Sequence, residues 1–173
     1  LVEELDILTL NAQPQIESDG EAEIVFLDQL LIEVMSEFQL LIEREERDIY
    51  IQVSPESAKI KSHYGKLSRI LLNLLNNAFK YSDPGTKIEI VAQLTEQILT
   101  ISVKDEGRGI SPENLDKIFK RLYRVETSRN MKTGGHGLGL AIARELAHQL
   151  GGEITVESQY GLGSTFTFTL NLT

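Results

Sequence analysis

Apolar residues recur at helical spacing in several stretches of this chain. Leucines in residues 1–10 follow an i, i+4, i+7 pattern, which indicates the end of an amphipathic helix. Residues 11–20 hold Pro, Ser, Asp and Gly and are predicted to form a linker. Further helices are predicted within residues 27–43, 67–79 and 137–150.

Alternating apolar and polar residues predict strands between these helices. The pattern occurs in residues 49–53, 87–94, 98–105, 153–157 and 165–170. Because strands and helices are interleaved, we predict an α/β fold, a two-layer sandwich in which helices cover one face of a mixed sheet.

Composition narrows the possible partners. The 173 residues include 17 basic and 26 acidic ones, and the net charge of −9 argues against nucleic acid as the main partner. Residues 1–65 carry −11 and residues 66–136 carry +4, so an anion would bind in the middle third. The chain has no Cys and no apolar run of the ~20 residues that a membrane span needs. It begins with Leu rather than Met, so we expect a piece of a larger protein.

One polar face of the 67–79 helix has the residue types of a metal and phosphate site. Lys66, Arg69, Asn73, Asn77 and Lys80 recur at spacings of 3, 4, 4 and 3. A carboxamide oxygen suits Mg²⁺, which takes few protein ligands and borrows phosphate oxygens, and a nearby lysine would face the same phosphates. A merely solvated helix face is the alternative.

Asp105 lies on the core face of its strand. The alternation places it with Leu99, Ile101 and Val103, and a buried carboxylate without a hydrogen-bond donor is costly. The following glycines leave room for a flat ligand, and an exocyclic amino group such as that of adenine would be a suitable donor. An Asp that accepts local backbone hydrogen bonds in a β-turn is the alternative.

A glycine-rich segment, residues 134–140, leads directly into the last predicted helix. Free N–H groups and the positive end of the helix dipole suit phosphate there. The segment lacks the Gly-Lys-Ser/Thr ending of a Walker loop and the glycine spacing of a dinucleotide fingerprint.

These three features, in this order, resemble the catalytic and ATP-binding domain of sensor histidine kinases, in the Bergerat-fold (GHKL) superfamily that includes gyrase, Hsp90 and MutL. Residues 69–82 look like the N box of the family, 105–109 like its G1 box and 117–124 like its F box. Residues 135–140 look like the G2 box and 161–165 like the last glycine motif. The resemblance covers residues 24–170.

The resemblance implies roles for individual residues. Asn77 would hold Mg²⁺, Asp105 would accept the adenine amino group, and Asn73, Lys80 and Arg124 would form the catalytic set. The implied nucleotide-binding residues are Asn77, Lys80, Tyr81, Asp105, Gly107, Gly109, Ile110, Arg124, Gly135, His136, Gly137, Leu138, Gly139, Leu140 and Thr165. Within this set, His136 is interpreted as a lid residue without a catalytic duty.

Two positions depart from the family pattern. His136 stands where Thr or a small residue is common. The F box usually has a second aromatic residue where this chain has Leu122. Relatives that hydrolyse ATP carry a Glu general base four residues before the metal-binding Asn, where this chain has Asn73. An amide cannot take the proton, so the resemblance favours a kinase over an ATP hydrolase.

The resemblance also implies an organisation and partners. Residues 1–20 would be the end of a dimerisation hairpin and a linker, residues 21–173 the catalytic domain, and residues 110–136 a mobile, basic ATP lid. None of the histidines in this chain begins the sequence motif that carries the phosphorylated histidine in the family. The γ-phosphoryl group of Mg·ATP would therefore pass to a histidine on the dimerisation domain of the same kinase, which would be a homodimer. From that histidine it would pass to a response regulator.

The resemblance implies that this chain is a cytoplasmic domain of a membrane-anchored bacterial kinase. The kinase would contact the membrane only through segments outside this chain. The lid string from Arg124 resembles Gram-positive kinases of the VanS type. A degenerate nucleotide-binding or interaction module without phosphotransfer is the alternative function.

Overall fold

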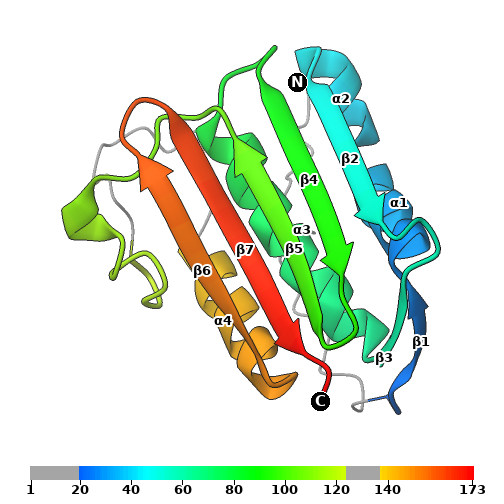
Figure 1. Ribbon diagram of the computed structural model, residues 1–173. Helices are drawn as coiled ribbons and strands as arrows, with labels where there is room; N and C mark the ends of the chain where they lie inside the picture. Colours follow the sequence, from blue (N-terminus) through cyan, green and yellow to red (C-terminus); the bar gives the residue numbers. More distant parts are fainter. Residues whose placement is uncertain (1–19, 124–136) are drawn as a thin grey trace, which may run out of the picture.

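A computed structural model describes residues 20–123 and 137–173. Its main feature is a five-stranded sheet in the order β2-β4-β5-β7-β6 (Figure 1). The strands are β2 (Asp48–Ser54), β4 (Lys87–Leu94), β5 (Ile98–Asp105), β6 (Gly152–Gln159) and β7 (Gly163–Asn171). β2 pairs with β4 in parallel and every other pairing is antiparallel, so the predicted mixed sheet is confirmed.

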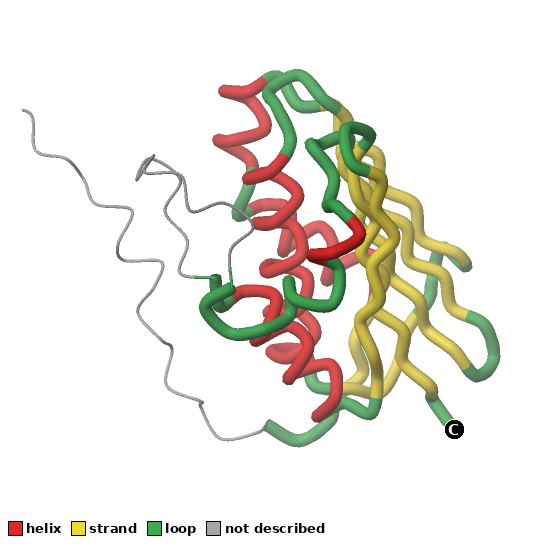
Figure 2. Tube along the Cα trace, turned by 90° about the vertical axis from the view of Figure 1, so that its left-hand side faces the viewer, coloured by secondary structure: helices red, strands yellow, loops and turns green. Residues whose placement is uncertain are grey.

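Helices cover one face of this sheet and leave the other open (Figure 2). They are α1 (Leu27–Ser36), α2 (Gln39–Glu45), α3 (Tyr64–Tyr81) and α4 (Gly139–Gln149). The predicted two-layer α/β sandwich is therefore confirmed. In the two stretches that the structure covers, no helix has the length and apolar character needed to cross a membrane.

The core lies between α3 and the covered face of the sheet. The apolar stripe predicted for α3, Leu67, Ile70, Leu71, Leu74, Leu75, Ala78 and Phe79, is buried along its whole length. It packs over a layer that includes Ile101 and Val103 of β5 and Phe166 and Phe168 of β7. Burial of this stripe directs the opposite, polar face of α3 away from the sheet.

The prediction of one helix over residues 27–43 is wrong, because the chain breaks between α1 and α2. The residue at the break is Phe38, which is buried and stacks on Phe79 with ring centroids 4.8 Å apart. The apolar residues keep helical spacing across this break, so spacing alone does not reveal it.

A second, two-stranded sheet was not predicted. β1 (Glu23–Phe26) pairs antiparallel with β3 (Lys59–Ser62). Each strand has four residues, too few for a clear alternation. A 3₁₀ turn, η2 (Pro112–Asn114), interrupts the segment predicted as a lid. The predicted hairpin tail over residues 1–10 and most of the linker that follows it lie outside the described residues.

Candidate functional site

One pocket collects residues from several elements of the chain. It is lined by the ends of α3 and β5, by the segment after β5, and by the beginnings of α4 and β7. Its lining consists of Asn77, Tyr81, Asp105, Arg108, Gly109, Ile110, Ile118, Tyr123, Leu140 and Ser164. Six of these, Asn77, Tyr81, Asp105, Gly109, Ile110 and Leu140, belong to the set expected from the sequence.

Asp105 forms the polar end of the pocket. Its side chain is 3% exposed, and its Oδ1 accepts a hydrogen bond from the Gly107 N–H at 2.8 Å. Burial raises the pKa of its carboxyl, while hydrogen bonds from the backbone of Gly107 and Ser164 and the charge of Arg47 act in the opposite direction. A carboxylate has about four acceptor positions, so Asp105 can also accept a hydrogen bond from a ligand in the pocket.

The glycines after Asp105 are required by protein contacts. A Cβ at Gly107 would overlap the Tyr81 carbonyl and lie 2.6 Å from Asp105 Oδ1, and one at Gly109 would overlap the Gln159 carbonyl. Gly109 also has φ of +68°, where a side chain is strained. The sequence predicted room for a ligand, and the structure adds that the loop needs glycine to pack against the end of α3.

The two asparagines of α3 have different surroundings. Asn77 lines the pocket, as expected of a residue near bound phosphates. Asn73 donates from Nδ2 to the Arg69 carbonyl at 2.9 Å, and its Oδ1 lies 3.0 Å from where a Cβ on Gly139 would be. Asn73 therefore packs against the first turn of α4 and does not line the pocket.

Two cations lie close to the ring of Tyr81. The Lys80 Nζ is 5.3 Å from the centre of its ring and the Arg108 guanidinium carbon is 4.6 Å from it. Arg108 lines the pocket, whereas Lys80 does not. Two positive groups beside an aromatic ring that lines a pocket form a suitable setting for an anionic ligand.

The beginning of α4 meets the segment that follows η2. The Leu122 N–H donates to the Gly137 carbonyl at 3.0 Å, and Gly137 has φ of +68°. Gly137, Leu138 and Gly139 lie next to the pocket without lining it, and Leu140 lines it. Of the predicted site residues, Arg124, Gly135 and His136 lie outside the described residues, as does the VanS-like string.

The structure puts Ser164 in the pocket and leaves out the predicted Thr165. Ser164 is buried opposite Asp105 in the pairing of β5 with β7 and lines the pocket. Because adjacent residues of a strand face opposite sides of the sheet, the side chain of Thr165 faces the other side. Thr165 pairs with Lys104 in the same ladder. The alternation with buried Phe166 could have identified Ser164, while Arg108, Ile118 and Tyr123 have no comparable sequence signal.

The donor set of this pocket favours a polyanion with a hard metal ion over a protein-bound metal centre. Among residues 20–123 and 137–173, no group of three His, Cys, Asp or Glu side chains could hold a metal ion. The carboxamide of Asn77 is a neutral oxygen donor at the pocket wall. This donor fits Mg²⁺ that takes its other ligands from phosphate and water.

Comparison with known proteins agrees with this geometry. The sequence pattern described as histidine kinase-, DNA gyrase B-, and HSP90-like ATPase matches residues 63–173. The histidine protein kinase SaeS of Staphylococcus epidermidis is 43% identical over 150 residues, which are 86% of this chain and 43% of that protein. The chain thus spans less than half the length of this relative.

Solved structures with the same fold include the catalytic domain of the histidine kinase ThkA, with a TM-score of 0.77 and 26% identity over 88% of this chain and 96% of that one. A structure of ThkA in complex with the response regulator TrrA has a TM-score of 0.74 and 24% identity, covers 88% of this chain and 42% of that one, and shows the shared fold.

Proposed function

Because the chain belongs to the histidine kinase-, DNA gyrase B- and HSP90-like ATPase family, we propose that its pocket binds Mg·ATP and that the γ-phosphoryl group goes to a histidine. The bond between the γ-phosphorus and the β–γ bridging oxygen breaks, a bond from an imidazole nitrogen to phosphorus forms, and ADP leaves. The chain is then the catalytic domain of a protein histidine kinase in a two-component system.

The observation that carries this proposal is the meeting of Asn77, Tyr81 and Asp105 in one pocket. In the proposed complex, Asp105 accepts a hydrogen bond from the adenine amino group. Tyr81 and Lys80 lie beside the sugar and phosphates, and Asn77 offers its carboxamide oxygen at the phosphate end.

Bound Mg²⁺ would neutralise phosphate charge and orient the γ-phosphoryl group for in-line transfer. Asn77 is the residue that would hold it. Lys80 and the predicted Arg124 would supply further positive charge. The backbone from Gly137 into the first turn of α4 would offer its N–H groups to phosphate oxygens.

Transfer to histidine is favoured over hydrolysis by the surroundings of Asn73. Its amide cannot accept a proton from water, and its Nδ2 already donates to the Arg69 carbonyl. Among the described histidines, His63 Nδ1 is 2.7 Å from the Gly20 carbonyl oxygen and His148 lies in the last turn of α4. We therefore assign the phosphate acceptor to the dimerisation domain of the same kinase, a homodimer.

The remaining partners follow from this assignment. The phosphohistidine would pass its phosphoryl group to an aspartate of a response regulator, the class of protein that binds ThkA. Residues 1–20 are proposed to join the domain to its dimerisation hairpin, residues 110–136 to cover bound ATP, and the kinase to be anchored in a membrane with this domain on the cytoplasmic side.

Calorimetry with ATP, in excess Mg²⁺ and in EDTA, tests the proposal on the 173-residue chain. Mg²⁺ is expected to strengthen binding, and Asn77→Ala is expected to lose about tenfold in affinity with Mg²⁺ and little without it. Asn76→Ala is the matched control because Asn76 is the exposed neighbour on the same helix.

A second measurement tests the reaction itself. The chain is mixed with a histidine-bearing dimerisation domain and ATP labelled at the γ-phosphate, and acid-labile label on that domain is expected. Binding of ATP with no transfer to a competent dimerisation domain would support the interaction module instead. No binding by the folded wild-type chain would refute the nucleotide site.

A further inference from the structure

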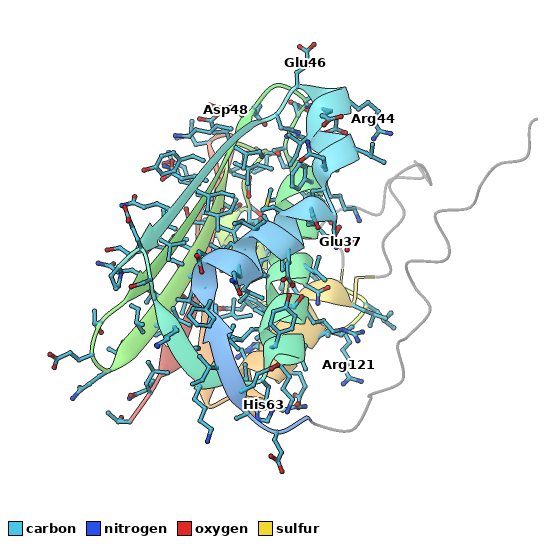
Figure 3. All side chains as sticks on the ribbon, turned by 90° about the vertical axis from the view of Figure 1, so that its right-hand side faces the viewer. Glu37, Arg44, Glu46, Asp48, His63 and Arg121 are labelled. Atoms are coloured by element: carbon cyan, nitrogen blue, oxygen red, sulfur yellow. The ribbon has the colours of Figure 1, made fainter. Side chains whose placement is uncertain are left out.

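Arg47 is a buried arginine outside the pocket. It stands between α2 and β2, and its side chain is almost inaccessible although its neighbours Arg44, Glu46 and Asp48 lie at the surface (Figure 3). A fully buried charge is rare unless it is paired. The position therefore calls for a specific reason.

Every N–H of the Arg47 guanidinium has an acceptor. Nε donates to the Glu45 carboxylate at 2.9 Å. One terminal nitrogen donates to Ser82 Oγ at 2.7 Å and Thr86 Oγ1 at 2.9 Å. The other donates to the carbonyls of Phe79 at 3.2 Å and Ser82 at 2.8 Å. A guanidinium has five N–H donors, so this set of partners is complete.

Two of these acceptors are backbone carbonyls at the end of α3. The last carbonyls of a helix lack partners within the helix and carry its negative dipole end. Arg47 binds the carbonyls of Phe79 and Ser82, and the Ser82 hydroxyl donates to the Ala78 carbonyl at 2.7 Å. The guanidinium therefore fixes where α3 stops and how the chain leaves it.

The end of α3 in turn carries the loop of the nucleotide pocket. The Tyr81 carbonyl accepts a hydrogen bond from the Arg108 N–H at 3.2 Å and lies against Gly107. Tyr81 itself lines the pocket. A displacement of the last turn of α3 would thus move Tyr81 and the loop over residues 105–109 together.

We propose that Arg47 is a positioning residue for the base-binding end of the pocket, acting through the C-terminus of α3. This inference rests on the proposed function. The charge of Arg47 supports the same role, because it favours the ionised form of Asp105 and lowers the pKa that burial raises. Tyr81 and Arg108 line this pocket together with Asp105, and Lys104 and Glu157 line a second cavity that Asp105 also borders. The backbone N–H groups of Gly107 and Ser164 donate hydrogen bonds to the Asp105 carboxylate.

The test measures ADP affinity of the 173-residue chain by calorimetry between pH 5 and pH 8, below the melting temperature of each variant. Arg47→Met is expected to weaken binding about tenfold at pH 7. Its affinity is also expected to fall at a higher pH than that of the wild type on acidification, since Asp105 then takes up its proton more readily. Arg47→Lys keeps the positive charge but not the five hydrogen bonds. Its pH profile is therefore expected to lie closer to that of the wild type than its ADP affinity does.

Arg44→Met is the matched control, because Arg44 lies three residues earlier with an exposed side chain that points into solvent (Figure 3). It is expected to bind as the wild type does. A folded Arg47→Met with wild-type affinity and an unchanged pH profile overturns the inference. If that variant does not fold, Ser82→Ala replaces it, and wild-type ADP affinity in this variant overturns the inference equally. Failure of the wild-type chain itself to bind ADP refutes the proposed function, and the inference with it.

Discussion

Replacing Asp105 by Asn separates stability from ligand binding. In the ligand-free chain the buried carboxylate is held by the backbone of Gly107 and Ser164, and burial raises its pKa. The native state therefore binds the Asp105 proton more readily than the unfolded chain, whose Asp pKa is about 3.9. The stability that this group contributes is fully present below that value and is lost as the pH rises through the folded pKa.

At neutral pH the wild type must keep an ionised carboxylate in a buried place, and the amide of Asn removes that requirement. We expect ligand-free Asp105→Asn to melt at the same temperature as the wild type or higher at pH 7, and to lose the gain in stability that the wild type shows on mild acidification. The Gly107 N–H can still donate to the amide oxygen, and Nδ2 then takes the place of the second carboxylate oxygen.

Nucleotide binding should change in the opposite direction. A hydrogen bond to a charged acceptor contributes about 1.5–3 kcal/mol, so its loss weakens ADP binding roughly 10- to 150-fold. In addition, the Nδ2 group of the substituted side chain would meet the adenine amino group, and two donors cannot hydrogen-bond to each other. Thermal melts with and without ADP, followed by calorimetry, measure both effects on the same samples.

Glu106→Gln is the control for this experiment. Glu106 is the exposed neighbour, and its carboxylate accepts from the Lys87 N–H at 3.2 Å. It should bind ADP as the wild type does. Asp105→Asn with wild-type affinity, or with a ligand-free melting temperature several degrees below that of the wild type, would refute the reasoning.

Two further predictions concern packing. Gly107→Ala should lower the melting temperature and weaken ADP binding, because its Cβ would overlap the Tyr81 carbonyl. Gly65→Ala, in open space on α3, should instead stabilise the chain by about 0.5–1 kcal/mol. Equal melting temperatures for the two variants would contradict this prediction. Phe79→Ala removes the ring stacked on Phe38 and should lower the free energy of unfolding, measured in urea, by about 3–5 kcal/mol. A decrease of less than about 1 kcal/mol would contradict the packing described.

The parts of this fold that follow a regular period could be predicted from the sequence. The strands at 87–94 and 98–105 have the predicted bounds, and α3 buries its predicted stripe. Asp105 is buried as the alternation of its strand required. These features are local, since side-chain period and secondary structure are linked within a few residues.

Other parts depend on contacts that the period does not encode. The break before α2 lies at Phe38, whose ring stacks on the distant Phe79, and the apolar spacing continues across it. The pairing of β1 with β3 joins two strands too short to show a pattern. The placing of Ser164 rather than Thr165 beside Asp105 follows from the register between β5 and β7.

The sequence by itself determined the alternation that buries Asp105, the polar face of α3 and the order of the glycine-rich segments, and the resemblance built on them pointed to the family. Only the tertiary structure decided which of these residues share a pocket, that Asn73 packs on α4 while Asn77 faces the cavity, and that Arg47 holds the end of α3. The physical reason is that a hydrogen bond or contact across distant segments depends on how the layers pack, and a lone Arg or Phe carries no periodic signal of its distant partner.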